Sequence, residues 1–294
     1  MNGKDIRWTL ATVALMLGGS LAPARAVTLT QVGSAINISQ SFSPAFREAS
    51  GLGLAKKETK LWSVSDETFT MYKMNLDGSA VTSFIPSPAS GVSTVSKPDF
   101  EGVTYAPQPP GSDNDHYIYL ANEHDNSILP VNYDSQKYHT WTKLSAMSGY
   151  NSVACEGTTT VSKEFENAGS SGLEGITWDP DLNSFFVIKE KDPGLIVQIS
   201  QDLQTIRSCK VLTFSGHDYS DISYDPTRKQ FWIVSDEAKA VYLYDFGTNA
   251  SVFSYNLPYS NGEGVSYDPD LHRLYITTDN GKDSDSYLYT YNVQ

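Results

Sequence analysis

The chain of 294 residues is long enough for one large all-β domain or two smaller domains. A hydrophobic content of 39%, with 12% aromatic residues, excludes a disordered chain, and the excess of Tyr (18) over Phe (12) favours β-strands over helical bundles and coiled coils. The formal net charge of −13 argues against nucleic acid and anionic membranes as partners, whereas cations would be attracted wherever the carboxylates converge.

The N-terminal stretch MNGKDIRWTLATVALMLGGSLAPARA has the pattern of an export signal. Lys4 and Arg7 precede a short apolar run, and the closing ARA is typical of a cleavage site. A retained membrane anchor is the alternative, but the apolar run is too short to favour it. We therefore predict a signal peptide at 1–26, a single domain at 27–294, periplasmic or secreted localisation, and no membrane span after the signal is removed.

One pattern recurs five times along the rest of the chain, with its Gly position at 51, 102, 175, 221 (Asp in this copy) and 264. The last three copies read EGITWDPDLNSFFVIKEK, SDISYDPTRKQFWIVSDE and EGVSYDPDLHRLYITTDN. Within a copy, two β-rich runs flank a turn, a third alternating run follows, and a fourth precedes the next copy. Repeated units of four strands are typical of propeller blades. We therefore predict an all-β, five-bladed β-propeller of four-stranded antiparallel blades.

Two segments depart from the simple repeat. The step from the second to the third copy is the longest, which predicts an insertion in the second blade at about 137–171. The last copy has room for only three strands, whereas VTLTQVGSAINIS, which begins at Val27, alternates like an unassigned strand. We expect this N-terminal strand to complete the last blade and close the ring, so that no long edge stays free.

The chain has two cysteines, Cys155 and Cys209. In an exported protein an even pair favours a disulfide, which would tie the insertion to the third blade. Two buried free thiols are the alternative.

Acidic residues recur at two positions of the repeat. Four of them begin a first strand: Glu101, Glu174, Asp221 and Glu263. Five end a second strand: Asp66, Glu123, Glu190, Asp236 and Asp279. Because the second strand runs antiparallel to the first, both positions lie at the same face, and radial repetition gathers them around one mouth of the central channel.

A hard cation with about six to eight oxygen ligands is the usual way to neutralise converging carboxylates. We predict calcium bound by the first four acids, with the other five as a weaker acidic rim. The alternative is that these acids only accept hydrogen bonds from loop amides.

Signatures of common catalytic sites are absent from the sequence: it contains no HExxH zinc motif, GxSxG elbow, Walker loop or dinucleotide fingerprint. The catalytic residues of any enzyme activity are therefore unknown. His124, His217 and Asp221 are candidates for a general base near the acidic face, and exposed loop histidines are the alternative reading of the first two.

The strings EGITWDPDLNSFFVIKEKDPG, SDISYDPTRKQFWIVSDE and EGVSYDPDLHRLYITTD resemble the SdiA-regulated family of bacterial exported proteins, over essentially the whole mature chain. The resemblance implies a five-bladed propeller related to NHL-type repeats, with a calcium site. Ser50 and Ser220 stand at the Glu position of two copies, which puts a symmetric ligand ring in doubt. The EG-x-x-W-D start is also distantly similar to calcium-dependent lactonases of the gluconolactonase type, in which a first-strand Glu binds the metal.

We expect an exported calcium-binding β-propeller that acts as a binding or structural module, with an unidentified small molecule or protein at the channel face. The alternative is a calcium-dependent hydrolase of a lactone, ester or phosphate ester that uses the same site. A saturated ion would favour the module, and an open water position beside an acid of raised pKa would favour the enzyme.

Overall fold

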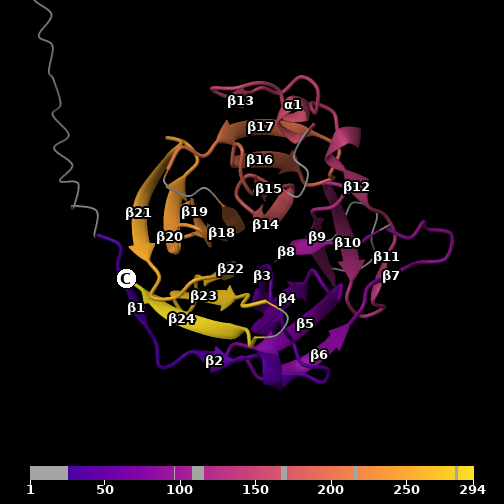
Figure 1. The fold of residues 1–294 in the computed structure, drawn as a ribbon. Helices are drawn as coiled ribbons and strands as arrows, with labels where there is room; N and C mark the ends of the chain where they lie inside the picture. Colours follow the sequence, from indigo (N-terminus) through magenta and orange to yellow (C-terminus); the bar gives the residue numbers. More distant parts are fainter. Residues whose placement is uncertain (1–25, 96, 108–115, 167–170, 215–217, 282–283) are drawn as a thin grey trace, which may run out of the picture.

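Five small β-sheets stand around a central axis like the blades of a propeller (Figure 1). This computed structural model describes residues 26–95, 97–107, 116–166, 171–214, 218–281 and 284–294. The inner strands of neighbouring blades contact one another around the axis. The prediction of an all-β, five-bladed propeller is confirmed.

The blades are numbered by the chain order of their inner strands. Blade 1 contains β3 (Leu52–Ala55), β4 (Lys60–Ser65), β5 (Thr70–Asn75) and β6 (Ala80–Phe84). Blade 2 contains β8 (Phe100–Tyr105), β9 (Tyr117–Asn122), β10 (Ser127–Asn132), β11 (Lys137–Tyr138), β7 (Ser87–Pro88) and β12 (Thr142–Lys143). Blade 3 contains β14 (Leu173–Asp179), β15 (Ser184–Lys189), β16 (Leu195–Ser200), β17 (Ile206–Val211) and β13 (Cys155–Glu156).

Blade 4 contains β18 (Tyr219–Asp225), β19 (Gln230–Ser235), β20 (Ala240–Asp245) and β21 (Ala250–Asn256). Blade 5 contains β22 (Gly262–Asp268), β23 (Arg273–Thr278), β24 (Tyr287–Val293), β1 (Leu29–Gln31) and β2 (Ile36–Asn37). The helices are short: α1 (Val161–Phe165) and the 3-10 helices η1 (Ser39–Ser41), η2 (Lys56–Glu58) and η3 (Leu144–Ala146). Within the described part of the chain, no helix is long and apolar enough to cross a bilayer.

The Asp-Pro dipeptides form the turn between the first and second strands of blades 3, 4 and 5. In blade 3, Asp179 Oδ1 accepts hydrogen bonds from the backbone N–H groups of Asp181 (2.8 Å) and Leu182 (3.1 Å). Asp225 and Asp268 accept the equivalent pairs of backbone hydrogen bonds in blades 4 and 5. Each carboxylate thus satisfies amides that the hairpin leaves unpaired, which explains why Asp precedes the turn proline.

The core consists of five apolar clusters, each lying between two neighbouring blades. Between blades 1 and 2, for example, Trp62 and Val64 pack with Val103 and Leu120. Alternating strands present one apolar side to each neighbour, so a blade buries both of its faces only when it has a neighbour on each side.

The N-terminal strand completes blade 5, as predicted. β1 pairs antiparallel with β24, with Leu29 opposite Val293. Farther along, β2 pairs with the beginning of the same strand, and Ile38 N donates to Ser286 O at 3.0 Å. Ile38 is fully buried in the cluster between blades 5 and 1, so the closing segment contributes to the core as well as to the sheet.

The segment predicted as an insertion in blade 2 belongs to two blades. Its first part supplies β11 and β12 beside β10, and its later part supplies β13, which pairs parallel with β17 of blade 3. Cys155 in β13 and Cys209 in β17 form a disulfide. The segment therefore crosses the outside of the ring and is fastened covalently to blade 3. The predicted signal peptide, except its last residue, lies outside the described residues.

We expect deletion of residues 27–38 to lower the melting temperature sharply and to cause aggregation, because β24 would become an exposed edge. Thermal unfolding and light scattering measure this, and a peptide of the same residues added in trans should restore part of the stability. A truncated protein that stays monomeric with an unchanged melting temperature would refute closure by this strand.

Replacement of both cysteines, Cys155→Ser with Cys209→Ser, should lower the free energy of unfolding by about 2 to 4 kcal/mol, because the cross-link restricts the unfolded chain. Urea denaturation measures the change. Wild type treated with a reductant should match the double variant, which itself should not respond to the reductant. Two reactive thiols in denatured, unreduced wild type would contradict the bond.

Candidate functional site

The Glu-Gly dipeptide of the repeat forms a β-bulge at the start of the inner strand. In β8, Phe100 pairs with Asn122 and Gly102 pairs with Ala121, so Glu101 is the extra residue. Glu174 is the extra residue of β14, and the pairing of β22 is interrupted at Glu263. A bulge changes the direction in which a side chain leaves the sheet, and here it recurs at one mouth of the channel.

The glycine after each bulge allows neighbouring inner strands to approach closely. A Cβ atom on Gly102 would lie 2.7 Å from Glu174 O of the next blade. One on Gly175 would lie 2.7 Å from Asp221 Oδ1. Because real Cβ atoms do not come so close, the repeat requires Gly at these positions.

Two overlapping groups of carboxylates meet at this mouth, between blades 2 and 3. Asp99, Glu101 and Glu123 have oxygens within 4.8 Å of one another, and so do Glu123, Glu174 and Glu190. We call these five residues the acidic mouth. Four of them were predicted from the repeat. The sequence analysis missed Asp99. It lies two residues before Glu101 in the string KPDFEG, and residues two apart in an extended strand lie on the same face, so the sequence did contain a signal for it.

Hydrogen bonds satisfy only part of the acidic mouth. Glu101 Oε2 accepts from Ser50 Oγ at 2.7 Å, and Glu123 Oε1 accepts from Gly172 N at 2.9 Å. Glu190 Oε1 is bound by Lys191 Nζ. Glu190 Oε2 is buried and has no hydrogen-bond partner among the described residues. The site thus contains more acceptor oxygens than its donors satisfy.

Burial raises the pKa values of Asp99, Glu101, Glu123 and Glu174, and the charges of neighbouring acids raise them further. The pKa of Glu101 lies well above its usual range because of burial and then the charge of Asp66. The pKa of Glu174 is raised well above its usual range by burial and then by Glu101. Burial also raises the pKa of Asp66 to about 6. At neutral pH these groups therefore hold protons or repel one another, unless a cation neutralises them.

Asp221 lies apart from both carboxylate groups. Its Oδ2 atom accepts hydrogen bonds from Leu52 N (3.0 Å) and Val265 N (2.9 Å), and the side chain is fully buried. This carboxylate therefore links blade 4 to blades 1 and 5 at the axis. Burial raises its pKa well above the usual range.

Glu263 also belongs to neither group. Its pKa is raised well above the usual range by burial and then by Asp236 of the neighbouring blade. Asp236 Oδ1 accepts from Asn261 N at 2.5 Å, and Asp279 Oδ1 accepts from Gly281 N at 2.6 Å. At these rim positions the acids accept hydrogen bonds from loop amides, as the alternative reading of the repeat proposed.

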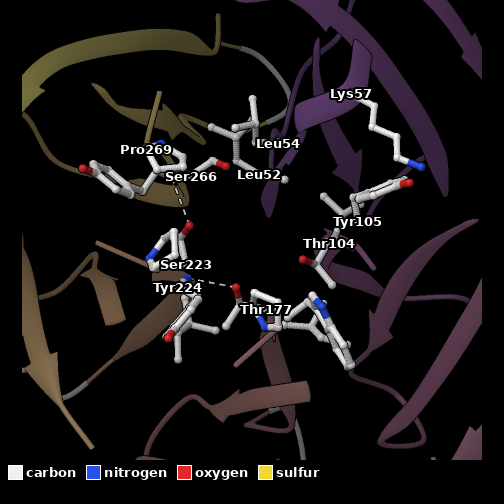
Figure 2. A pocket seen from close by; sticks show the side chains of 18 of the residues that line it. Leu52, Leu54, Lys57, Thr104, Tyr105, Thr177, Ser223, Tyr224, Ser266 and Pro269 are labelled. Atoms are coloured by element: carbon white, nitrogen blue, oxygen red, sulfur yellow. Dashed lines mark hydrogen bonds between the residues drawn. The ribbon is translucent and has the colours of Figure 1, made fainter. Parts of the chain in front are cut away.

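The opposite mouth of the channel holds a cavity of about 530 Å³ that the sequence analysis did not identify (Figure 2). It is lined by the far ends of the inner strands and by the Asp-Pro turns. The aromatic residues of the lining are Tyr105, Trp178, Tyr224 and Tyr267. They share one position of the repeat, the Tyr or Trp of strings such as EGITWDP, so the signal was present in the sequence.

The raised pKa of Asp66 determines whether the free energy of unfolding rises or falls with pH. Its pKa of about 6 in the folded protein exceeds 3.8, so the folded state binds more protons and the free energy of unfolding falls as pH rises through this interval. In the presence of a chelator, Asp66→Asn should therefore raise the melting temperature relative to wild type at pH 8 and have little effect at pH 4.

The control for this prediction is Asp77→Asn, because hydrogen bonds from Ser79 lower the pKa of that exposed carboxylate. It should show no gain at high pH. A difference between Asp66→Asn and wild type that does not vary with pH would contradict the buried, unneutralised state of Asp66.

Comparison with solved structures supports the architecture. Glutaminyl cyclase of Myxococcus xanthus aligns with a TM-score of 0.59 and 10% identity, over 90% of this chain and 96% of that chain. A luciferin-regenerating enzyme aligns with a TM-score of 0.51 and 12% identity, over 84% of this chain and 92% of that chain. Likeness at such identities shows a common fold alone. No curated protein matches the sequence.

The family described as SdiA-regulated matches residues 24–257, which include the N-terminal strand and the inner strands of blades 1 to 4. The matched residues include EGITWDPDLNSFFVIKEKDPG and SDISYDPTRKQFWIVSDE, two of the three strings that carry the resemblance. The chain belongs to the SdiA-regulated family.

Proposed function

We propose that this protein is an exported calcium-binding propeller that acts as a binding module, with the ion at the acidic mouth. The observation that carries the proposal is the convergence of Asp99, Glu101, Glu123, Glu174 and Glu190 in two groups that share Glu123. A cation between them would remove the repulsion that now raises the pKa values of Asp99, Glu101, Glu123 and Glu174.

The donor set fits calcium better than zinc. Every candidate ligand in the two groups is a carboxylate, and calcium accepts about six to eight oxygen ligands with flexible geometry. Zinc prefers histidine and cysteine ligands, which these groups lack. Glu190 Oε2, for which the described part of the chain provides no hydrogen-bond donor, is a second argument, because a buried carboxylate oxygen without a donor is costly unless a cation compensates it.

We assign the ligand roles to Glu101, Glu123 and Glu174, with Asp99 and Glu190 completing the shell. Asp221 and Glu263 are not assigned as ligands, since neither belongs to the two carboxylate groups. The Asp221 carboxylate is already engaged with two backbone amides, which suits a structural role at the axis.

Export rests on the N-terminal signal pattern and is compatible with the disulfide between Cys155 and Cys209. Disulfides persist mainly in oxidising compartments. A periplasmic or secreted location would also supply the calcium concentration that an extracellular site of moderate affinity needs.

A calcium-dependent hydrolase of a lactone, ester or phosphate ester is the second candidate, and the two structural neighbours are described as enzymes. The ion would polarise the substrate, and a base would be needed beside it. Asp221 is unsuitable because it is fully buried between three blades. His124 is exposed and close enough to Asp99 to affect its pKa, whereas His217 lies outside the described residues.

Calcium at about 100 times its dissociation constant should stabilise the protein by about 2.7 kcal/mol, so a chelator should lower the melting temperature by several degrees. Magnesium should substitute poorly because its small octahedral shell suits few carboxylate cages. Glu174→Gln should greatly weaken the response to calcium. Glu166→Gln, at an exposed site beyond α1, should respond like wild type.

A melting curve that ignores both chelator and calcium would overturn the calcium module and the calcium-dependent hydrolase together. Ester or lactone turnover that needs calcium and disappears in His124→Ala would favour the hydrolase over the module. A calcium response without such turnover favours the module.

A further inference from the structure

The mouth opposite the acidic mouth is a concave, largely apolar site. Tyr105, Trp178, Tyr224 and Tyr267 come from the inner strands of blades 2 to 5, and we call the cavity that they line the aromatic cup. Its volume of about 530 Å³ is in the range of small-molecule sites. No residue of the acidic mouth lines it.

The hydroxyl groups of Tyr224 and Tyr267 are bound to partners on the turns, which leaves their rings to form apolar walls. Tyr224 Oη donates to Asp181 Oδ2 at 3.1 Å, and Tyr267 Oη lies 3.3 Å from His272 Nδ1. Trp178 packs against Phe185 with ring centroids 4.8 Å apart. Fixed aromatic walls of this kind suit a flat ring, because they lose little freedom when a ligand stacks on them.

The floor of the aromatic cup offers hydroxyl donors. Thr177 Oγ1 accepts from Tyr224 N at 2.9 Å and Ser223 Oγ accepts from Tyr267 N at 3.0 Å, so each hydroxyl keeps its own hydrogen to donate. Figure 2 shows the hydroxyl group of Thr104 turned toward the middle of the cavity. None of these three hydroxyls donates to an acceptor in the part of the chain that the structure describes. A ligand with a hydrogen-bond acceptor would satisfy them.

The charges of the lining indicate a neutral occupant. Lys57 and Asp270 are its ionisable residues of opposite sign, and they come from blades 1 and 5. Asp221, bonded to the amides of Leu52 and Val265, joins three blades and does not line the cup. The aromatic cup shares no lining residue with the carboxylate groups.

We propose that the aromatic cup binds a neutral small molecule with a planar aromatic or heteroaromatic ring that bears a hydrogen-bond acceptor. The ring stacks against the aromatic walls, and the acceptor receives a hydrogen bond from the floor hydroxyls. A saccharide would demand more polar groups around its edge than these apolar walls provide.

Quinoline and naphthalene form a matched pair of probes, because they share size and shape and only quinoline has an acceptor. Saturation-transfer NMR should show saturable binding of quinoline. Trp178→Ala should lower the affinity for both probes about tenfold, because stacking on the indole ring is lost. Thr104→Val keeps the side-chain shape but removes the hydroxyl group. It should lower the affinity for quinoline about two- to tenfold and leave the affinity for naphthalene unchanged. Trp141→Ala, outside the cup, should change neither.

Methyl glucoside tests the saccharide alternative, and thermal melting of each variant checks that it folds. Binding should be the same in calcium and in chelator, so the result does not depend on the proposed calcium site. The proposal is overturned if quinoline shows no saturable binding, if Trp178→Ala and Trp141→Ala behave alike, if Thr104→Val affects both probes equally, or if the glucoside binds more tightly than quinoline.

Discussion

The close approach of the inner strands at the axis is the constraint on which the rest of the molecule depends. Glycines such as Gly102 and Gly175 remove the Cβ atoms that would collide with the next blade. Asp221 then binds the amides of Leu52 and Val265 and so joins three blades at once. These contacts lie near the beginnings of the inner strands, so the residues before them face the acidic mouth and the far ends of the strands line the opposite one.

The acidic mouth carries an electrostatic cost that the fold itself creates. The bulges at Glu101 and Glu174 turn two carboxylates into a space that burial and neighbouring acids make unfavourable for charge. Donors from loops offset part of that cost, as Gly172 N does for Glu123. The remaining charge is what the proposed cation would neutralise, and we expect it to make the stability of the protein depend on pH.

The two mouths have contrasting chemistry although the same five strands build both. One end presents carboxylates at the bulges, and the other presents hydroxyl groups, aromatic rings and turn prolines. Blade 1 differs at both ends, with Ser50 at the acid position and Gly53 with Leu54 in place of the hydroxyl and aromatic residues. The repeat is therefore functionally asymmetric, and the acidic mouth lies off the axis between blades 2 and 3.

The amino-acid sequence by itself determined the blade number, the closing strand and the Asp-Pro turns, because these follow from local periodicity and from residues with strong backbone preferences. It also indicated which acids share a face. Only the tertiary structure decided that Glu123 joins Glu101 and Glu174 with Asp99, while Asp221 turns to the axis. The reason is that distances between blades depend on the bulges, the ring closure and hydrogen bonds across sheets. The aromatic cup likewise becomes a cavity only once the ring brings equivalent positions of successive repeats together.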